Sequence, residues 1–519
     1  MSNKNKQGFG LDQPLMHSDH RRSMTRRDFV SQGFSLGMGT MLGGSLFSLF
    51  GSTSAHGLSA DLQNFLDTQC GAFSASDAKI PFMCFDLAGG ANIAGSNVLV
   101  GGPGGQEDFL SASGYQKQGL PVDMVPNLDS AANPQIDRSL GLLFHSDSQL
   151  LRGILERAPA AAANINGAVI PARSENDTGN NHHNPMYAIN RAGANGELLT
   201  LIGSRASDSG GNSMAPMAYI DPAVRPTKVD RASDVTGLVD TGDLVSLLNT
   251  VDTTAVMETV YRLSDAKLGR VNTHITTDAV VKDLVRCGYL KSASVAETFG
   301  DPNSLNPEAD ANIVGANGIF SQLEYDSDRE FRKTAAAMKL VVNGFAGAGT
   351  VTMGGYDYHT GDRQTGERRD LRAGRCIGAC LDYARRLNKP IMIYVFSDGS
   401  VFSNGMIDNS VDGRGKGVWT GDNQQTASSF FLVYNPGGRP TAIRNQIGYM
   451  RPSGDVETSA TPIANNVNLL VEAIALNYMA LHGEQGNFAN VFPNQGIGSA
   501  ADSLIAFNPI FDGNINNPS

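Results

Sequence analysis

The chain has little positive charge, few cysteines and few aromatic residues. Its 519 residues include one tryptophan and five cysteines, and the net charge is −11. This acidic balance argues against nucleic acid as a partner and against a basic membrane-binding surface. Aromatic residues make up only 7% of the chain, which disfavours a carbohydrate-binding module.

The cysteines are too few and too scattered to form a disulfide framework. An odd number at wide spacing is not the pattern of a disulfide-stapled domain. Cys376 and Cys380 lie four residues apart, which is not the Cys-x-x-Cys spacing of redox or zinc sites. We therefore expect buried free thiols at all five positions, Cys70, Cys84, Cys287, Cys376 and Cys380.

The bulk composition is that of a packed globular protein. Hydrophobic residues make up 41% and charged residues 18%, so a buried core is expected. The 59 glycines indicate many turns and loops. We expect one large α/β domain over residues 56–519.

The first 55 residues have the pattern of an export signal. Arg26-Arg27 followed by Phe29 resembles the twin-arginine signal of bacteria, and a mildly apolar stretch covers residues 33–50. Ser52 to Ala55 supplies small residues, so we predict cleavage after Ala55. The alternative is a membrane anchor, but glycines interrupt the stretch before it reaches the roughly twenty apolar residues of a spanning helix. A periplasmic or secreted protein with no membrane span after processing is expected.

Apolar strands alternate with amphipathic helices along the rest of the chain. This rhythm predicts a mostly parallel central sheet flanked by helices. Residues 214–318 are punctuated by prolines between helical patches, and we interpret them as a largely helical insertion. Strands are expected at 80–85, 166–171, 197–202, 349–353, 390–396 and 429–434, with helices at 58–70, 328–344, 370–387 and 467–481, and a polar glycine-rich loop at 399–427.

Three of the predicted strands stop at an acidic residue: Asp86, Asp357 and Asp398. The carboxyl ends of strands in open α/β sheets are where ligands bind. His359 lies two residues beyond Asp357, and carboxylate with imidazole suits a divalent metal ion. Two other interpretations stay open: Asp86 caps the turn that follows it, and Asp357 with His359 is a solvated loop.

Histidines elsewhere are weaker candidates. His182 and His183 follow the strand at 166–171, which makes His183 a further candidate metal ligand, although adjacent histidines in a polar loop are usually solvated. His145 and His274 are expected to be structural. Asp408 to Gly413 resembles half of a calcium loop, but the twelfth position is Trp419 rather than glutamate.

The order of these motifs resembles the exported, sulfatase-like proteins of unknown function within the alkaline phosphatase superfamily. The resemblance covers most of residues 80–435. Its most specific part is the Gly-Gly-aromatic-Asp-x-His motif. The carrying stretches are the twin-arginine leader, Gly89-Gly90-Ala91-Asn92, Gly354-Gly355-Tyr356-Asp357-Tyr358-His359 and Ser397-Asp398-Gly399.

The resemblance implies a metal-dependent hydrolase of phosphate or sulfate esters. In that superfamily two metal ions activate a serine or threonine and neutralise charge in the transition state. Carried over to this chain, Asp357 and His359 would bind one ion and Asp398 the other. The nucleophile stays open among Ser96, Ser174 and Thr178.

The chain departs from the superfamily pattern at three positions. Asn92 stands where an aspartate is usual, Gly399 where a histidine is frequent, and Asn423 where the later Asp-His-Gly element has its histidine. Neutral amides are poor ligands for such ions. We therefore expect at most one divalent ion (Zn, Mn, Ca or Mg), held by Asp357, His359 and Asp398 with Asp86 or His183.

Two functions follow. The first is an exported protein with a degenerate metal site that acts in binding or in envelope or secretion-related assembly with a protein partner. The second is an active metal-dependent hydrolase of a small-molecule phosphate or sulfate ester.

Overall fold

The computed structural model describes residues 58–69, 79–128, 134–174, 181–239, 250–272, 278–298 and 302–510. These residues fall into two compact units. The sheet unit contains the described parts of 79–239 and 302–510. The helical unit contains 58–69, 250–272 and 278–298. The export signal predicted over residues 1–55 and the histidine at position 274 lie outside the described residues.

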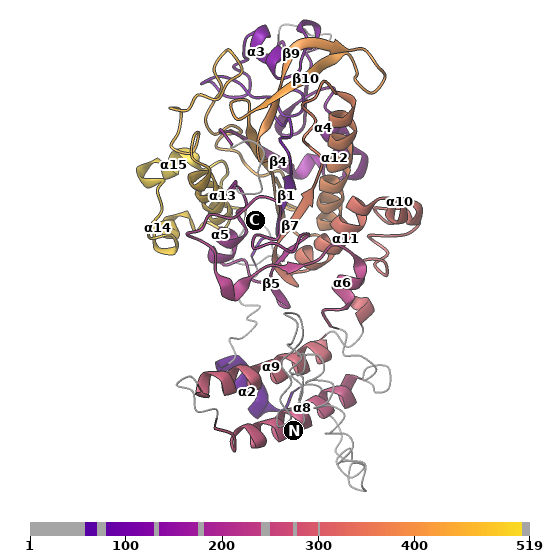
Figure 1. Ribbon diagram of the computed structural model, residues 1–519, viewed down its shortest axis with the longest axis vertical. Coiled ribbons are helices and arrows are strands. Elements are labelled where there is room, and N and C mark those ends of the chain that lie inside the picture. The colour runs from indigo at the N-terminus through magenta and orange to yellow at the C-terminus, as the bar shows by residue number, and fades with distance from the viewer. Residues whose placement is uncertain are drawn as a thin grey trace, which may run out of the picture. The chain divides into compact units, whose positions relative to one another are not determined.

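A seven-stranded mixed sheet forms the centre of the sheet unit (Figure 1). Its strand order is β4-β11-β8-β1-β7-β5-β6. Only β11 runs antiparallel to its neighbours, and the other pairs within this sheet are parallel. The strands are β1 (Phe82–Leu87), β4 (Ile165–Pro171), β5 (Leu199–Gly203), β6 (Thr227–Lys228), β7 (Ala346–Met353), β8 (Ile391–Phe396) and β11 (Ser428–Tyr434).

The apolar character of the predicted strands explains this sheet. Every residue of β1, β7 and β8 is buried, because helices cover both faces of the sheet and leave no face for water. The predicted α/β class with a mostly parallel central sheet is thereby confirmed.

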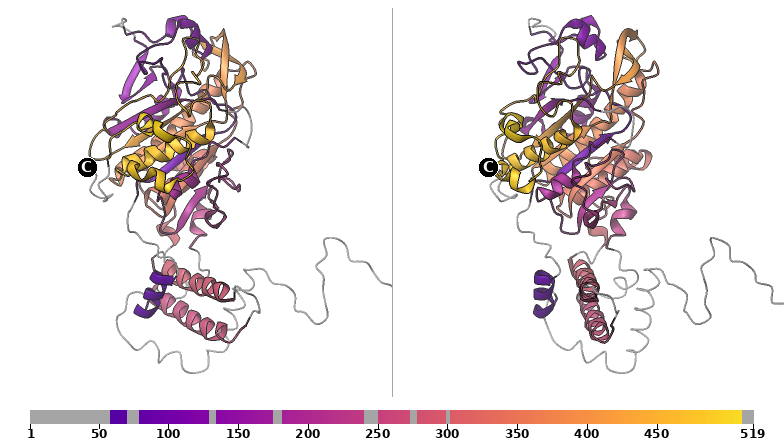
Figure 2. Two further views of the ribbon diagram at one scale, coloured as in Figure 1. Left: turned by 90° about the vertical axis from the view of Figure 1, so that its left-hand side faces the viewer. Right: turned by 60° about the vertical axis from the view of Figure 1, so that its left-hand side comes forward.

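Two helical layers enclose the sheet. One face is covered by α4, α11 and α12, and the opposite face by α5 and α13 (Figures 1 and 2). The helices are α3 (Ala112–Lys117), α4 (Gln149–Arg157), α5 (Met186–Arg191), α6 (Ala232–Thr236), α10 (Gln322–Ser327), α11 (Arg329–Val342), α12 (Gln364–Arg386), α13 (Val467–Leu481), α14 (Phe488–Val491) and α15 (Ala501–Leu504).

Helix starts follow local capping chemistry. The carboxylate of Asp328 accepts the backbone N–H of Glu330 at 2.8 Å and begins α11. A reciprocal capping box between Ser321 and Glu324 begins the preceding helix, α10. Both arrangements satisfy N–H groups that have no acceptor within the helix.

The segment predicted as a polar loop over 399–427 is instead mostly a β-ribbon. β9 (Ser400–Asp408) pairs antiparallel with β10 (Lys416–Asn423). A second small ribbon joins β2 (Ile136–Leu140) to β3 (Leu142–His145). Glycines within β9 and β10 hide the alternation of polar and apolar residues that would otherwise indicate strands. The stretch from Asp408 to Gly413, which resembles half of a calcium loop, is the end of β9 and part of the turn of its ribbon.

The helical unit consists of α2 (Ala60–Gln69), α8 (Thr250–Leu268) and α9 (Asp278–Thr298). A small apolar core joins the three helices, and it includes Leu62, Tyr261 and Leu290. Both ends of the range 214–318, predicted as one helical insertion, belong instead to the sheet unit. None of the helices in the described ranges is long and apolar enough to cross a membrane.

The cysteine prediction holds at three positions and is wrong at one. Cys84, Cys376 and Cys380 are free and buried. Cys287, on α9, is disulfide-bonded, so its partner lies outside the described residues. Wide spacing in the sequence concealed this bond, because the chain between two bridged cysteines can be long.

Candidate functional site

Three strand-end acids meet at one edge of the sheet. β1 lies between β7 and β8 and is parallel to both, with Asp86 in register with Thr352 and Phe396. Asp398 lies two residues beyond the end of β8, and Asp357 lies four residues beyond the end of β7. The shared edge is the carboxyl end of these strands, where α/β proteins place their ligands.

The Asp86 carboxylate is occupied by donors from a distant loop. Its Oδ2 accepts the backbone N–H groups of Asn212 at 2.6 Å and Ser213 at 3.0 Å, and the hydroxyl of Thr352 at 3.1 Å. Its Oδ1 accepts the Ser213 hydroxyl at 3.2 Å. Burial raises the pKa of Asp86, although these hydrogen bonds oppose the rise. Asp86 therefore anchors the 212–213 loop.

Ser397 and Asp398 hold the glycine turn that follows β1. Asp398 Oδ1 accepts the Gly89 N–H at 2.6 Å, and its Oδ2 accepts the Asn212 side-chain amide at 3.1 Å. Ser397 Oγ accepts the N–H of Ala91 at 2.7 Å and donates to the Leu87 carbonyl at 2.6 Å. The acid at the end of β8 thus joins two loops through hydrogen bonds.

Gly89 brings the turn close to the Asp357 segment. Its φ is +121°, and a Cβ built on it would lie 2.5 Å from the backbone nitrogen of Asp357. Only glycine fits this approach and this backbone conformation. Asp357 and Asp398 are therefore placed on either side of one glycine.

Asp357 and His359 form an exposed pair. His359 Nε2 lies 2.8 Å from Asp357 Oδ1, and the side chains are 33% and 54% exposed respectively. Each can therefore reach solvent. This geometry fits both interpretations drawn from the sequence, a solvated loop and an exposed, weak site for a metal ion.

His183 is buried away from water. Its ring stacks on Phe396 with centroids 5.4 Å apart and planes 13° apart. Burial lowers the pKa of His183 to about 3, so the ring is neutral at physiological pH. Within the described residues neither ring nitrogen has a hydrogen-bond partner, and no three His, Cys, Asp or Glu side chains gather as a metal-binding group.

The amides that replace superfamily ligands have local structural surroundings. Asn423 Oδ1 accepts the backbone N–H groups of Gln425 at 2.6 Å and Thr426 at 2.8 Å, so it closes its own turn. Asn92 is buried, and its side-chain atoms have no hydrogen-bond partner among the described residues. Its backbone N–H donates to the Tyr358 hydroxyl at 2.9 Å.

Two of the candidate nucleophiles, Ser96 and Ser174, lie within the described residues, and the hydroxyl group of each is engaged in hydrogen bonds. Ser96 Oγ donates to the Gln118 carbonyl at 2.8 Å. Ser174 Oγ donates to the Ser397 carbonyl at 3.1 Å and accepts the side-chain amide of Asn181 at 2.8 Å. The third candidate, at position 178, lies outside the described residues.

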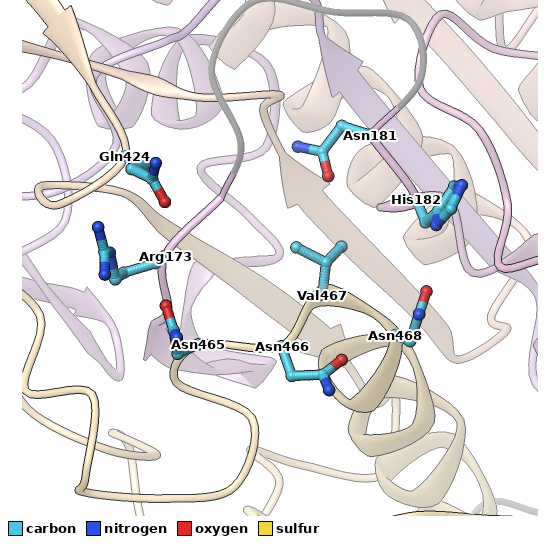
Figure 3. Close-up of a pocket in the computed structure, with 8 residues that line it drawn as sticks. All are labelled: Arg173, Asn181, His182, Gln424, Asn465, Asn466, Val467 and Asn468. Atoms are coloured by element: carbon cyan, nitrogen blue, oxygen red, sulfur yellow. The ribbon is translucent and has the colours of Figure 1, made fainter.

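A polar cavity of about 480 Å³ opens at the same side of the sheet, beyond the end of β4 (Figure 3). Four chain segments line it: the end of β4, the start of the α5 segment, the end of β10 and the N-terminus of α13. No carboxylate belongs to its described lining. The lining residues are Arg173, Asn181, His182, Gln424, Asn465, Asn466, Val467 and Asn468.

Sequence patterns missed this cavity. Arg173 lies two residues beyond β4, and that position was the only available signal. The asparagines around residue 466 begin a helix, and asparagine before a helix is ordinarily a cap. Asn466 does cap α13, since its Oδ1 accepts the Leu469 N–H at 3.2 Å.

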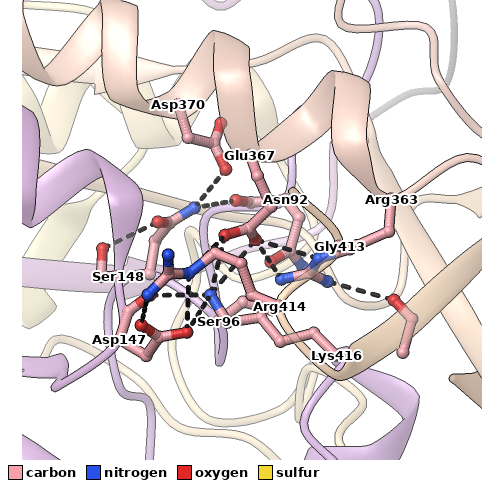
Figure 4. A network of polar contacts seen from close by, with 12 residues as sticks. Asn92, Ser96, Asp147, Ser148, Arg363, Glu367, Asp370, Gly413, Arg414 and Lys416 are labelled. Atoms are coloured by element: carbon pink, nitrogen blue, oxygen red, sulfur yellow. Dashed lines mark hydrogen bonds and ion pairs between the residues drawn. The ribbon is translucent and has the colours of Figure 1, made fainter. Parts of the chain in front are cut away.

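A buried ionic network lies between α12 and β10 (Figure 4). Glu367 accepts Arg363 Nε at 3.0 Å and Lys416 Nζ at 2.9 Å. The Arg363 guanidinium also lies 4.4 Å from the centroid of the Trp419 ring. Each cation has an acidic partner inside the network, which fits a structural role in fixing the β9–β10 ribbon against α12.

Asp370 adjoins this network. Burial, followed by the nearby Glu367 carboxylate, raises the pKa of Asp370 to about 7. The Asn97 side chain donates to Asp370 Oδ2 at 2.8 Å and favours the ionised form. Asp370 therefore titrates near neutrality inside the fold.

Neither the models of protein families nor the curated proteins contain a match to this chain.

Proposed function

We propose that the protein is an exported, sulfatase-like protein in which the metal site is degenerate and the carboxyl edge of the sheet serves binding rather than two-metal hydrolysis. The observation that carries this proposal is the engagement of Asp86. Four hydrogen bonds from Asn212, Ser213 and Thr352 occupy the carboxylate. A two-metal site needs free ligands for both ions, and the described residues do not fit that requirement.

The surroundings of the other candidates agree with this proposal. The carboxylate oxygens of Asp398 accept hydrogen bonds from Gly89 and Asn212. The amide oxygen of Asn423 accepts a backbone N–H within its own turn. His183 stacks on Phe396 inside the fold. Asp86 and Asp398 hold the loops at this edge of the sheet through hydrogen bonds, and a binding site requires loops that are held rigidly.

Export is supported by two independent features. Arg26-Arg27 precedes a weakly apolar stretch, and Cys287 is disulfide-bonded. Disulfides persist in oxidising compartments such as the periplasm and are rare in the cytosol. A periplasmic or secreted location is therefore proposed, with an envelope or secretion-related protein as a candidate partner.

A metal-dependent ester hydrolase is the second candidate function. It is favoured by the exposed Asp357–His359 pair, which shares the sheet edge with Asp398. One divalent ion at these three residues is the largest metal content that the proposal allows.

Elemental analysis of protein purified from the periplasm tests the metal site. We expect at most one equivalent of divalent ion in the wild type, and no Asp357-dependent hydrolysis of aryl sulfates or phosphates. Asp357→Ala is the test variant, and Asp502→Ala, an exposed acid on α15, is the matched control. Two equivalents of metal would contradict the degenerate site, and turnover lost only in Asp357→Ala would show that the chain is a hydrolase.

Export is tested in the same expression system. Replacing Arg26 and Arg27 by lysines should leave uncleaved precursor inside the cell, because the twin-arginine pair is the recognised feature. The matched control replaces the neighbouring pair, Arg21 and Arg22, by lysines. Normal export of the first variant would contradict the proposal.

A further inference from the structure

We propose that the cavity at the N-terminus of α13 binds a sulfate or phosphate ester of a sugar without a metal ion, with Arg173 as the anion-recognising residue. The inference rests on the proposed function, since it assigns a ligand to the same sheet edge. Its occupant is defined by the chemistry of the cavity wall, and each part of that wall makes a separate contribution.

Arg173 is a cation without a counter-charge in the described structure. Its backbone N–H donates to the Ala464 carbonyl at 2.7 Å, which fixes its position on the cavity wall. Its Nε is buried and has no hydrogen-bond partner among the described residues. A buried donor without an acceptor is costly, and a guanidinium prefers the paired oxygens of a sulfate, phosphate or carboxylate.

A second cavity of the sheet unit provides a comparison, because the arginines that line it are paired with acidic residues. This cavity, of about 450 Å³, is lined by both acids and arginines. Arg414 Nε donates to Asp147 at 3.0 Å, and Arg152 Nε donates to Glu156 at 3.0 Å. Those charges are neutralised within the protein. The Arg173 cavity has no acid in its described lining and so retains a need for an external anion.

The start of α13 adds to the anion preference. Val467 and Asn468 are the first two residues of this 15-residue helix and both line the cavity. The first N–H groups of a helix have no acceptor within it, and the helix dipole places partial positive charge there. Arg173 and the helix end therefore act on the same space (Figure 3).

The remaining wall suits hydroxyl groups. Gln424, Asn465 and Asn468 carry amides, which both donate and accept hydrogen bonds. A sugar hydroxyl also donates and accepts hydrogen bonds, so the amide side chains that line the cavity can each pair with a hydroxyl of one sugar. A volume of about 480 Å³ falls within the range of small-molecule sites.

Calorimetric titration of the purified mature protein tests the proposal. The probes are glucose 6-sulfate, glucose 6-phosphate, inorganic sulfate and glucose, each with and without EDTA. We expect at least one ester to bind more tightly than inorganic sulfate and glucose, with the same affinity in EDTA. Arg173→Gln should weaken ester binding by roughly ten- to a hundredfold, the value of a charge-assisted hydrogen bond. Arg444→Gln, a change at another partly buried arginine outside the lining, should leave it unchanged.

Asn468→Asp keeps the test independent of folding. An acid in the first turn of a helix stabilises the helix, whereas a negative charge on the cavity wall repels an anion. We expect intact thermal stability and weakened ester binding. Unchanged ester affinity in both Arg173→Gln and Asn468→Asp, or no binding of either ester, would overturn the inference. Ester binding that is lost in EDTA would overturn both this metal-free binding and the metal-poor sheet edge of the proposed function.

Discussion

The backbone N–H of Gly89 donates to Asp398 Oδ1 at 2.6 Å. This bond links the turn after β1 to the end of β8, the next strand in the sheet. A charge-assisted hydrogen bond of this length is among the stronger ones in proteins. Through this bond Asp398 fixes the turn after β1 at the edge of the sheet. Gly89 also brings this turn into close contact with the backbone of Asp357.

Replacing Gly89 by alanine should destabilise the sheet unit by about 2–4 kcal/mol. The new Cβ would meet the Asp357 nitrogen at 2.5 Å, and the φ of +121° is unfavourable for alanine. Urea unfolding followed by circular dichroism measures the change. Gly354→Ala is the matched control, because no atom lies near its added Cβ and its φ is not in the glycine region. Equal stability of the two variants would contradict the close approach.

Asp86→Asn should cost about 1–3 kcal/mol of unfolding free energy. An amide keeps one acceptor oxygen, but its NH₂ group would face the donors that now serve the other oxygen, including the N–H groups of Asn212 and Ser213. Proteolysis should also cut the 207–213 loop faster, since its anchor is lost. Asp357→Asn is the control, because that side chain is half exposed and should change stability by less than about 0.5 kcal/mol. Slower or unchanged cleavage in Asp86→Asn would refute the anchoring role.

The sheet was predictable because its strands are apolar along their whole length. β1 and β8 are buried at every residue, so their patterns differ clearly from those of loops. The order of strands and acids along the chain also placed Asp86, Asp357 and Asp398 at one edge. These inferences depend on local sequence and on the general parallel arrangement of α/β proteins.

The contacts of those acids were not predictable from the sequence. The donors to Asp86 come from residues 212 and 213, far along the chain, and no local pattern relates the two segments. The sequence predicts that Asn423 marks a lost ligand, and only the geometry of its turn shows which hydrogen bonds the amide forms instead. The position of Arg173 two residues beyond β4 was its only signal in the sequence, because the missing partner of its Nε can be recognised only in the folded, described chain.

Asp370 should make the stability of the sheet unit depend on pH. Its folded pKa is about 7, raised from 3.8, so the folded state holds a proton that the unfolded state releases between these values. The stabilising contribution is complete below about pH 4 and is lost as the pH rises to about 7. The contribution of Asp370 to the unfolding free energy should therefore fall across this window.

Asp370→Asn removes that titration while its oxygen can still accept the Asn97 amide. We expect the variant to match the wild type near pH 4 and to exceed it in stability near pH 7. Urea unfolding at four pH values between these limits measures the difference. A difference between the two proteins that stays constant across the window would show that Asp370 does not titrate there.

The thiols provide a test of both units at once. The chain has five cysteines, of which Cys84, Cys376 and Cys380 are free and buried and Cys287 is disulfide-bonded. Protein purified from the periplasm should resist iodoacetamide in its native state, because the burial that raises the pKa of Cys84 and Cys376 also excludes the reagent. Unfolding in urea without reductant should expose three reactive thiols, and reduction before alkylation should expose all five. Mass spectrometry counts the adducts at each step.

A Cys287→Ser variant should show four thiols in urea alone, since the former partner of Cys287 becomes free. Five adducts in the unreduced wild type would mean that no disulfide forms, and that result would also remove one of the two supports for export.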